Sequence, residues 1–154
     1  MNALKSISAY SNVFELQPSL VDVAFRPQLF SIPRVKRQME ELLRLSPGWD
    51  GYNGIPSTSD NIYFAISVLE STCGPTAPAP QIVPGASGDL QIEWHVDNAD
   101  IELHVRAPYD VHAWRQSAEH PDGEELFLST DFDLVAGWIQ EISEPTDAVS
   151  AAAA

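Results

Sequence analysis

Five residues in the second half of the chain carry side chains that could bind a metal ion or transfer a proton. Glu93 and His95 lie two positions apart in one alternating segment, Glu102 and His104 do so in the next, and His112 follows. Carboxylates beside imidazoles could hold a divalent cation, and a His–Glu pair could serve as general acid and base. The same residues also fit an ordinary water-facing strand, where polar side chains alternate in any case.

Two strands must position the first four of these side chains. Apolar and polar residues alternate over 90–95 and again over 101–106, which predicts strands with one buried and one wet face. The short polar stretch between them, 97–100, predicts a hairpin. The wet face of this hairpin is where we expect a binding surface or, alternatively, a Glu/His catalytic site.

The register of the hairpin decides which residues meet. A two-residue turn would place Glu93 opposite Glu102, which are like charges. A four-residue loop over 97–100 would place His95 opposite Glu102 and Glu93 opposite His104. Opposite charges across strands are favoured by about 0.2–1 kcal/mol each, so we expect the four-residue loop. Two-residue turns are sterically common, however, and stay as the alternative.

A third strand, over 109–116, adds an aromatic residue to the same surface. The parity of Trp114 places it with Asp110 and His112 on the open side, and an exposed Trp beside acids suits a protein interface. A slip of one residue would turn Trp114 into the core instead. Trp94 and Trp138 are expected to be structural.

A glycine-rich loop follows the first helix. Three glycines in seven residues permit a left-handed backbone, and a carboxylate there can accept bonds from loop N–H groups. We expect the two aromatic residues to hold the loop against the core, and we favour a structural turn over an anion cradle, which the carboxylate would repel. The structural loop comprises Gly48, Trp49, Asp50, Gly51 and Tyr52.

Apolar residues at helical spacing predict three helices. The expected apolar stripe of the first is Val35, Met39, Leu42 and Leu43, and that of the second is Ile62, Ala65, Ile66 and Leu69. The remaining elements are a strand over 124–130 and a short extended piece at 81–83. The helices are expected over 32–45, 59–72 and 131–143.

The order of elements indicates an α+β fold. After an N-terminal arm at 1–30, it runs α-α-β-β-β-β-α, with an antiparallel sheet of about four strands and helices packed on one face. We expect the arm to dock on something, 31–143 to form a single domain, and 144–154 to be a flexible acidic and alanine-rich tail.

The loop and hairpin together resemble a group of small uncharacterised bacterial and phage proteins. These share a GWDGY-type loop, a second helix, a proline and an (I/L)EWH…IEL hairpin, matched here by 48–52, Pro84, 93–95 and 101–103. The resemblance spans about 35–130. It implies a fold, a bacterial or phage setting, and no particular activity.

Familiar cofactor and catalytic signatures are missing from the sequence. It has no P-loop, no dinucleotide-binding glycine pattern, no HExxH, no GxSxG and no CxxC. We therefore expect no cofactor and no metal. The single cysteine, Cys73, is expected to be a half-buried apolar residue. With no apolar stretch long enough to cross a membrane and no secretion signal, a cytoplasmic location is expected.

The net charge of −14 is unevenly distributed. Six of the eight basic residues lie in 1–44, whereas 45–154 carry only Arg106 and Arg115 against eighteen acids. Such a field repels nucleic acid and favours a basic protein partner. Acidity that only keeps the protein soluble is the simpler alternative.

These observations predict a non-catalytic protein-binding module, such as an inhibitor, an antitoxin-like protein or an accessory factor of a phage or mobile element. Homodimerisation through the arm is possible in principle. The alternatives are an acidic mimic of nucleic acid, and a small metal-dependent or Glu/His hydrolase using Glu93, His95, Glu102 and His104. The expected binding surface comprises Glu93, His95, Glu102, His104, Asp110, His112 and Trp114.

Overall fold

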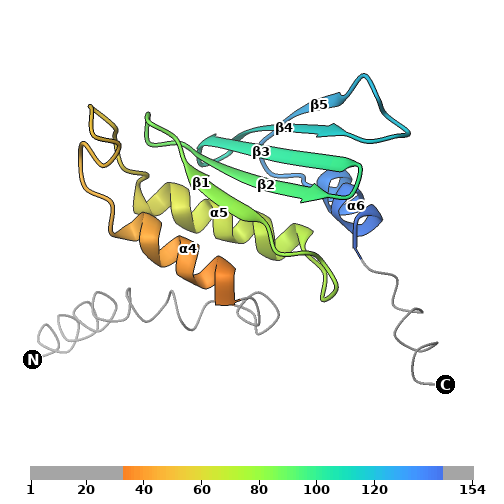
Figure 1. Cartoon of the computed structure of the whole chain (residues 1–154), viewed down its shortest axis with the longest axis horizontal. Helices are drawn as coiled ribbons and strands as arrows, with labels where there is room; N and C mark the ends of the chain where they lie inside the picture. The colour runs from red at the N-terminus through yellow and green to blue at the C-terminus, as the bar shows by residue number, and fades with distance from the viewer. Residues whose placement is uncertain (1–32, 144–154) are drawn as a thin grey trace, which may run out of the picture.

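In the part of the chain that the structure describes, three helices lie against one face of a five-stranded antiparallel sheet (Figure 1). The computed structural model describes residues 33–143, so the expected arm and tail lie outside the described residues. The α+β class is confirmed, with one strand more than expected. In chain order the elements are α4 (Pro33–Leu43), α5 (Ser59–Thr72), β1 (Gln81–Pro84), β2 (Leu90–Val96), β3 (Ala99–Ala107), β4 (Asp110–Gln116), β5 (Glu124–Leu128) and α6 (Asp133–Glu141).

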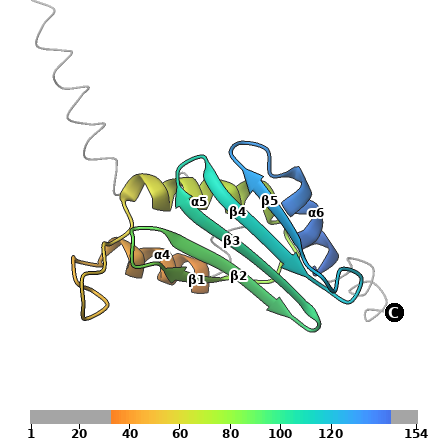
Figure 2. The same cartoon turned by 90° about the horizontal axis from the view of Figure 1, so that it is seen from above.

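The additional strand is β1, which the sequence suggested only as a short extended piece. It pairs with β2 so that Ile82 lies opposite Ile92, and both side chains are buried. Pro80 and Pro84 bracket it and leave too few residues for a clear alternation. The strands lie in chain order, with β1 at one edge above α4 and β5 at the other edge near α6 (Figure 2).

The register expected for the β2–β3 hairpin is wrong. The connection is a two-residue turn, Val96 pairs with Ala99, and Glu93 lies opposite Glu102. Asp97 takes a left-handed φ of 51°, which is the kind of turn that matches the twist of two paired strands. The cost of one like-charge pair is a fraction of a kcal/mol and does not override that turn geometry.

The middle helix, α5, begins and ends at the residues expected from the sequence. The Thr58 side chain accepts a hydrogen bond from the Asn61 amide at 3.2 Å and so caps α5, while Gly74 follows its last turn. The four expected core residues of α5 are all buried: Ile62, Ala65, Ile66 and Leu69.

Both outer helices end two residues earlier than expected, α4 at Leu43 and α6 at Glu141. In α4 the expected apolar stripe includes Leu43, but this residue is exposed at the last position of the helix, while Val35, Met39 and Leu42 are buried. In α6 the side chain of Asp131 accepts a hydrogen bond from the Asp133 amide at 3.0 Å, so the helix begins at Asp133.

One face of the sheet forms the core with the helices. Its alternate residues are buried along β2, β3 and β4, and the indole of Trp94 donates a hydrogen bond to the Pro78 carbonyl at 3.0 Å. A register shift of one residue would expose these apolar side chains to water. Their burial therefore fixes which side chains form the opposite face. The core residues of these strands are Leu90, Ile92, Trp94, Ile101, Leu103, Val105, Val111 and Ala113.

Candidate functional site on the open face of the sheet

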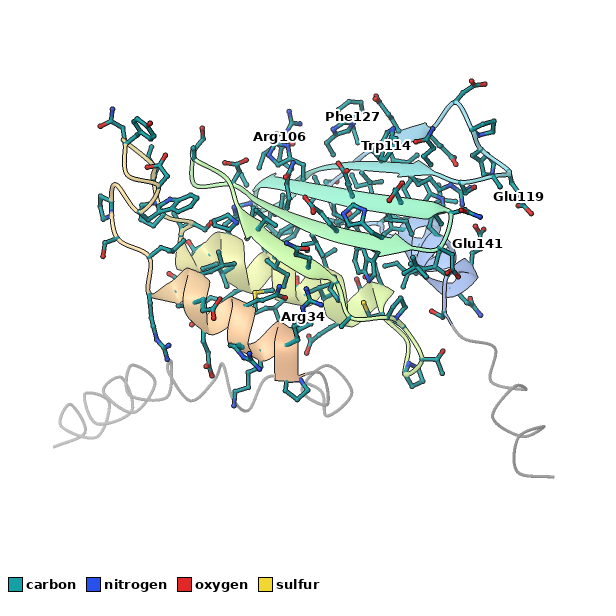
Figure 3. All side chains as sticks on the ribbon, in the orientation of Figure 1. Arg34, Arg106, Trp114, Glu119, Phe127 and Glu141 are labelled. Atoms are coloured by element: carbon teal, nitrogen blue, oxygen red, sulfur yellow. The ribbon has the colours of Figure 1, made fainter. Side chains whose placement is uncertain are left out.

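The face of the sheet turned away from the helices, here called the open face, carries most of the sequence-predicted site residues. Figure 3 shows Arg106, Trp114 and Phe127 on this side, with Arg34 on the helical side. Strand pairing arranges the open face in rows that run across the sheet. Its residues are Gln81, Val83, Gln91, Glu93, His95, Asp100, Glu102, His104, Arg106, Asp110, His112, Trp114, Gln116, Glu125 and Phe127.

One row places an aromatic ring between two carboxylates. Trp114 on β4 is paired with Glu102 on β3 and with Glu125 on β5, and Glu93 extends the row on β2. We call these four residues the tryptophan row. Of the two positions proposed for Trp114, the structure shows the open one, since its strand neighbours Ala113 and Arg115 point into the core.

The neighbouring row is built from imidazoles and a phenyl ring. His104 lies opposite His112, and His112 lies opposite Phe127. The rings of His112 and Phe127 stack with centroids 4.8 Å apart and planes 13° from parallel. The Nε2 atom of His112 is buried and makes no hydrogen bond to any described residue, and the Glu125 carboxylate is 3.6 Å from it. Phe127 itself is 72% exposed.

The residues expected to act together as acid and base are divided between two separate pairs. His95 contacts Asp100 at 2.7 Å and Glu93 at 3.4 Å near the hairpin tip. The hydrogen bonds that His95 donates to Asp100 and to Glu93 raise the pKa of its imidazole above the usual value. His104 instead pairs with Asp89, 2.5 Å away, just before β2.

The carboxylate of Asp89 is the more buried member of its pair. Burial opposes its ionisation, but the His104 side chain and two backbone amides, its own and that of Ser87, bind it, and its pKa is lowered. Asp89 also belongs to a network that joins the sheet to α5. The Ser57 hydroxyl donates to the Asp89 carbonyl at 3.0 Å, and the side-chain amide of Asn61 donates to the carbonyl groups of Gly88 and Val105 at 3.1 and 3.3 Å.

The described residues offer no ready metal site. Within 33–143, no three His, Cys, Asp or Glu side chains are grouped so that they could hold a metal ion. His95, His104 and His112 contact different carboxylates: Asp100 and Glu93 for His95, Asp89 for His104, and Glu125 for His112. The arrangement therefore presents charge and aromatic surface rather than a convergent catalytic pocket.

Asp110 and Trp114 have neighbours that limit their movement. Asp110 accepts a hydrogen bond from Arg106 at 2.6 Å, which neutralises the only cation on the described open face. Gly123 takes a φ of +80° in the turn before β5, and a Cβ at that position would lie 2.8 Å from the Trp114 indole nitrogen. The absence of a side chain there lets the turn lie close to the indole.

The glycine-rich loop is held by its carboxylate, as expected of a structural turn. Asp50 accepts hydrogen bonds from the amides of Tyr52 and Gly54 at 3.0 and 2.9 Å, and these bonds lower the pKa of Asp50. Gly48 and Gly51 have left-handed φ angles of 79° and 82°. The expectation that Tyr52 packs on the core is wrong, since it is 86% exposed.

Sequence reasoning missed a polar cluster on the core side of β4. Arg115 is buried and donates to Glu124 at 2.9 Å and to Glu141 at 2.8 Å. A third contact joins it to the His120 ring at 3.1 Å. The alternation that buries Val111 and Ala113 also points Arg115 inward. The same alternation in the sequence could therefore have predicted that Arg115 is buried. The cluster joins β4, the turn before β5, and α6.

Membrane insertion finds no support in the described helices, none of which is long and apolar enough to cross a bilayer. Comparisons of the chain with protein-family models, with curated proteins and with solved structures found no match. The case for a function therefore depends on the geometry of the open face.

Proposed function

We propose that the protein is a non-catalytic binding module whose open face takes up a partner protein with a basic surface. The observation that carries this proposal is the position of Trp114 between Glu102 and Glu125. An Arg or Lys side chain laid over the indole would gain a cation–π interaction and meet a carboxylate on either side. Tryptophan is also enriched among the residues that dominate binding energy at protein interfaces.

The charge of the open face supports a basic partner. Five acids lie on it, and its only described cation, Arg106, is neutralised by Asp110. The other described basic residues are Arg115, which is buried in the core, and four in or just after α4, a helix on the opposite side of the sheet. A face with five acids and only one arginine speeds association with a basic surface and makes it sensitive to salt.

The biological role we propose is that of an inhibitor, antitoxin-like protein or accessory factor acting in the cytoplasm. No side chains within 33–143 converge on a reacting centre, so the hydrolase alternative receives less support from the geometry. The nucleic-acid mimic predicts the same salt dependence as the binding module. It differs in one respect, because duplex DNA would then compete with the protein for its partner.

Affinity purification of the tagged full chain from its native host, run at low and high salt, tests the proposal. We expect a stoichiometric protein with a basic surface that is recovered at low salt and lost at high salt. Trp114→Ala should abolish its recovery. Tyr52→Ala is the matched control, because it removes an exposed aromatic ring that lies outside the open face.

Two outcomes would contradict the proposal. One is an empty eluate at both salt concentrations, and the other is a partner recovered equally by the wild type and Trp114→Ala. Circular dichroism must show that Trp114→Ala keeps the fold. Glu102→Gln combined with Glu125→Gln provides a second test, since both changes preserve side-chain size.

A further inference from the structure

The two edges of the sheet differ in how open they are to another strand. The β1 edge lies above α4 and is bracketed by Pro80 and Pro84, which lack backbone N–H groups (Figure 2). The β5 edge, Glu124–Leu128, contains no proline, and no described residue pairs with its outer side. Alternate N–H and C=O groups of an edge strand point away from the sheet and are free to pair.

The side chains on β5 indicate what kind of strand would pair there. Glu125 and Phe127 both project on the open face, and Phe127 is largely exposed. Glu124 faces the core side, where Arg115 already binds its carboxylate. Glu125 is thus the carboxylate of this strand that no described arginine or lysine binds, and Phe127 is its apolar neighbour two residues on.

From these observations we propose that a basic segment of the partner adds to β5 as a sixth strand, placing a cationic residue beside Glu125 and an apolar or aromatic residue beside Phe127. This inference rests on the proposed function and names how its partner is held. The new strand would extend the tryptophan row and the His112–Phe127 row by one position each. Residues two apart in the partner strand share one face, so the recognised pattern is a basic and an apolar residue two positions apart, with the basic residue first in a parallel strand and last in an antiparallel one.

A second copy of this chain is a less suitable occupant. Each copy carries a net charge of −14, so two acidic sheets joined edge to edge would repel one another. The carboxylates of Glu124 and Glu125 on a short edge strand are a common protection against such self-pairing. They leave the edge attractive to a basic strand.

The proposal is tested on the full chain by comparing a peptide that can form backbone hydrogen bonds to β5 with versions that cannot. The probe is a short fluorescein-labelled peptide that alternates valine with lysine and phenylalanine, and its binding is followed by fluorescence anisotropy. Two further versions carry N-methyl groups on alternate amides. The first version blocks the N–H groups along one edge of the extended peptide, and the second blocks those along the other edge. We expect one methylated version to bind about 10-fold or more weakly, while the other binds like the parent.

Substitutions separate this inference from the proposed function. Phe127→Ala should weaken peptide binding about 10-fold or more because it removes the exposed ring that the apolar residue of the peptide would contact, and Tyr52→Ala should leave binding unchanged. If both methylated versions bind like the parent peptide, strand addition is overturned, whereas loss of binding in Trp114→Ala would still uphold the open face. No peptide binding, or a dimer in sedimentation whose β5 amides resist hydrogen exchange, would also overturn it.

Discussion

The guanidinium carbon of Arg115 lies 4.8 Å from the centre of the Trp138 ring, so a buried charge on β4 stacks on the core side of α6. The same guanidinium donates to carboxylates on both of its flanks. Its three kinds of contact use the planar fork that distinguishes arginine from lysine. This one side chain joins the turn before β5, the sheet and the last described helix.

Arg115→Ala is therefore expected to lower the free energy of unfolding by about 2 kcal/mol. The loss is smaller than for a fully buried ion pair, because the side chains of Glu124 and Glu141 are 37% and 61% exposed and can regain water. Arg115→Met should lose less, since it keeps an apolar stem on Trp138. Urea unfolding with an unchanged m value measures the difference.

Arg106→Ala is the matched control for Arg115. It also removes an arginine from an ion pair, but the pair with Asp110 is exposed, and we expect a change of about 0–1 kcal/mol. Equal losses for the two alanine variants would show that the buried cluster contributes no more than a surface pair.

The imidazole of His95 should titrate above its ordinary value because Asp100 and Glu93 bind it. A raised pKa means that these contacts stabilise the hairpin tip fully at pH values below about 6.5 and are lost as the pH rises through the folded pKa. Asp100→Asn should shift the titration back toward the ordinary value. Histidine ring shifts followed by NMR against pH measure both.

Asp97→Asn provides the control for His95. It removes one negative charge from the same turn but leaves both hydrogen-bonded partners of His95 in place. If it lowers the pKa of His95 as much as Asp100→Asn does, general charge rather than the Asp100 contact sets the titration.

The thiol of Cys73 should be unreactive in the folded protein. Burial raises its pKa to about 11, and a hydrogen bond with Thr72 only partly opposes that effect. The thiolate is the reacting species, so modification by a disulfide reagent near pH 8 should be about 100-fold slower than for free cysteine. Urea should restore the rate. A native rate equal to the unfolded one would contradict the burial of Cys73.

Local patterns in the sequence predicted elements where capping and periodicity agreed. The α5 helix has both a Thr58 cap and a glycine after its end, and its bounds match the expectation. The strand β1 was read only as an extended piece, because its apolar pattern is short and flanked by prolines. Helical spacing places Leu43 in the core, but spacing alone cannot show that the helix ends at this residue.

The site was harder to predict than the fold. Parity placed Trp114 and His112 on one face, and strand pairing then brought Glu125 and Phe127 beside them. The hairpin register depended on a like-charge pair and on the geometry of the turn, and the geometry of the two-residue turn decided it. Contacts between distant segments, such as His104 with Asp89, have no local signal.

Salt and charge should act together on partner binding. If the tryptophan row guides a basic partner, then Glu102→Gln combined with Glu125→Gln should slow association and flatten its dependence on salt between about 50 and about 500 mM. Biolayer interferometry with the captured partner measures both rates. Glu41→Gln, an exposed acid on α4, should leave them unchanged. If Glu41→Gln changes the rates as much as the double substitution does, net charge alone attracts the partner. The open face would then not be the specific binding surface.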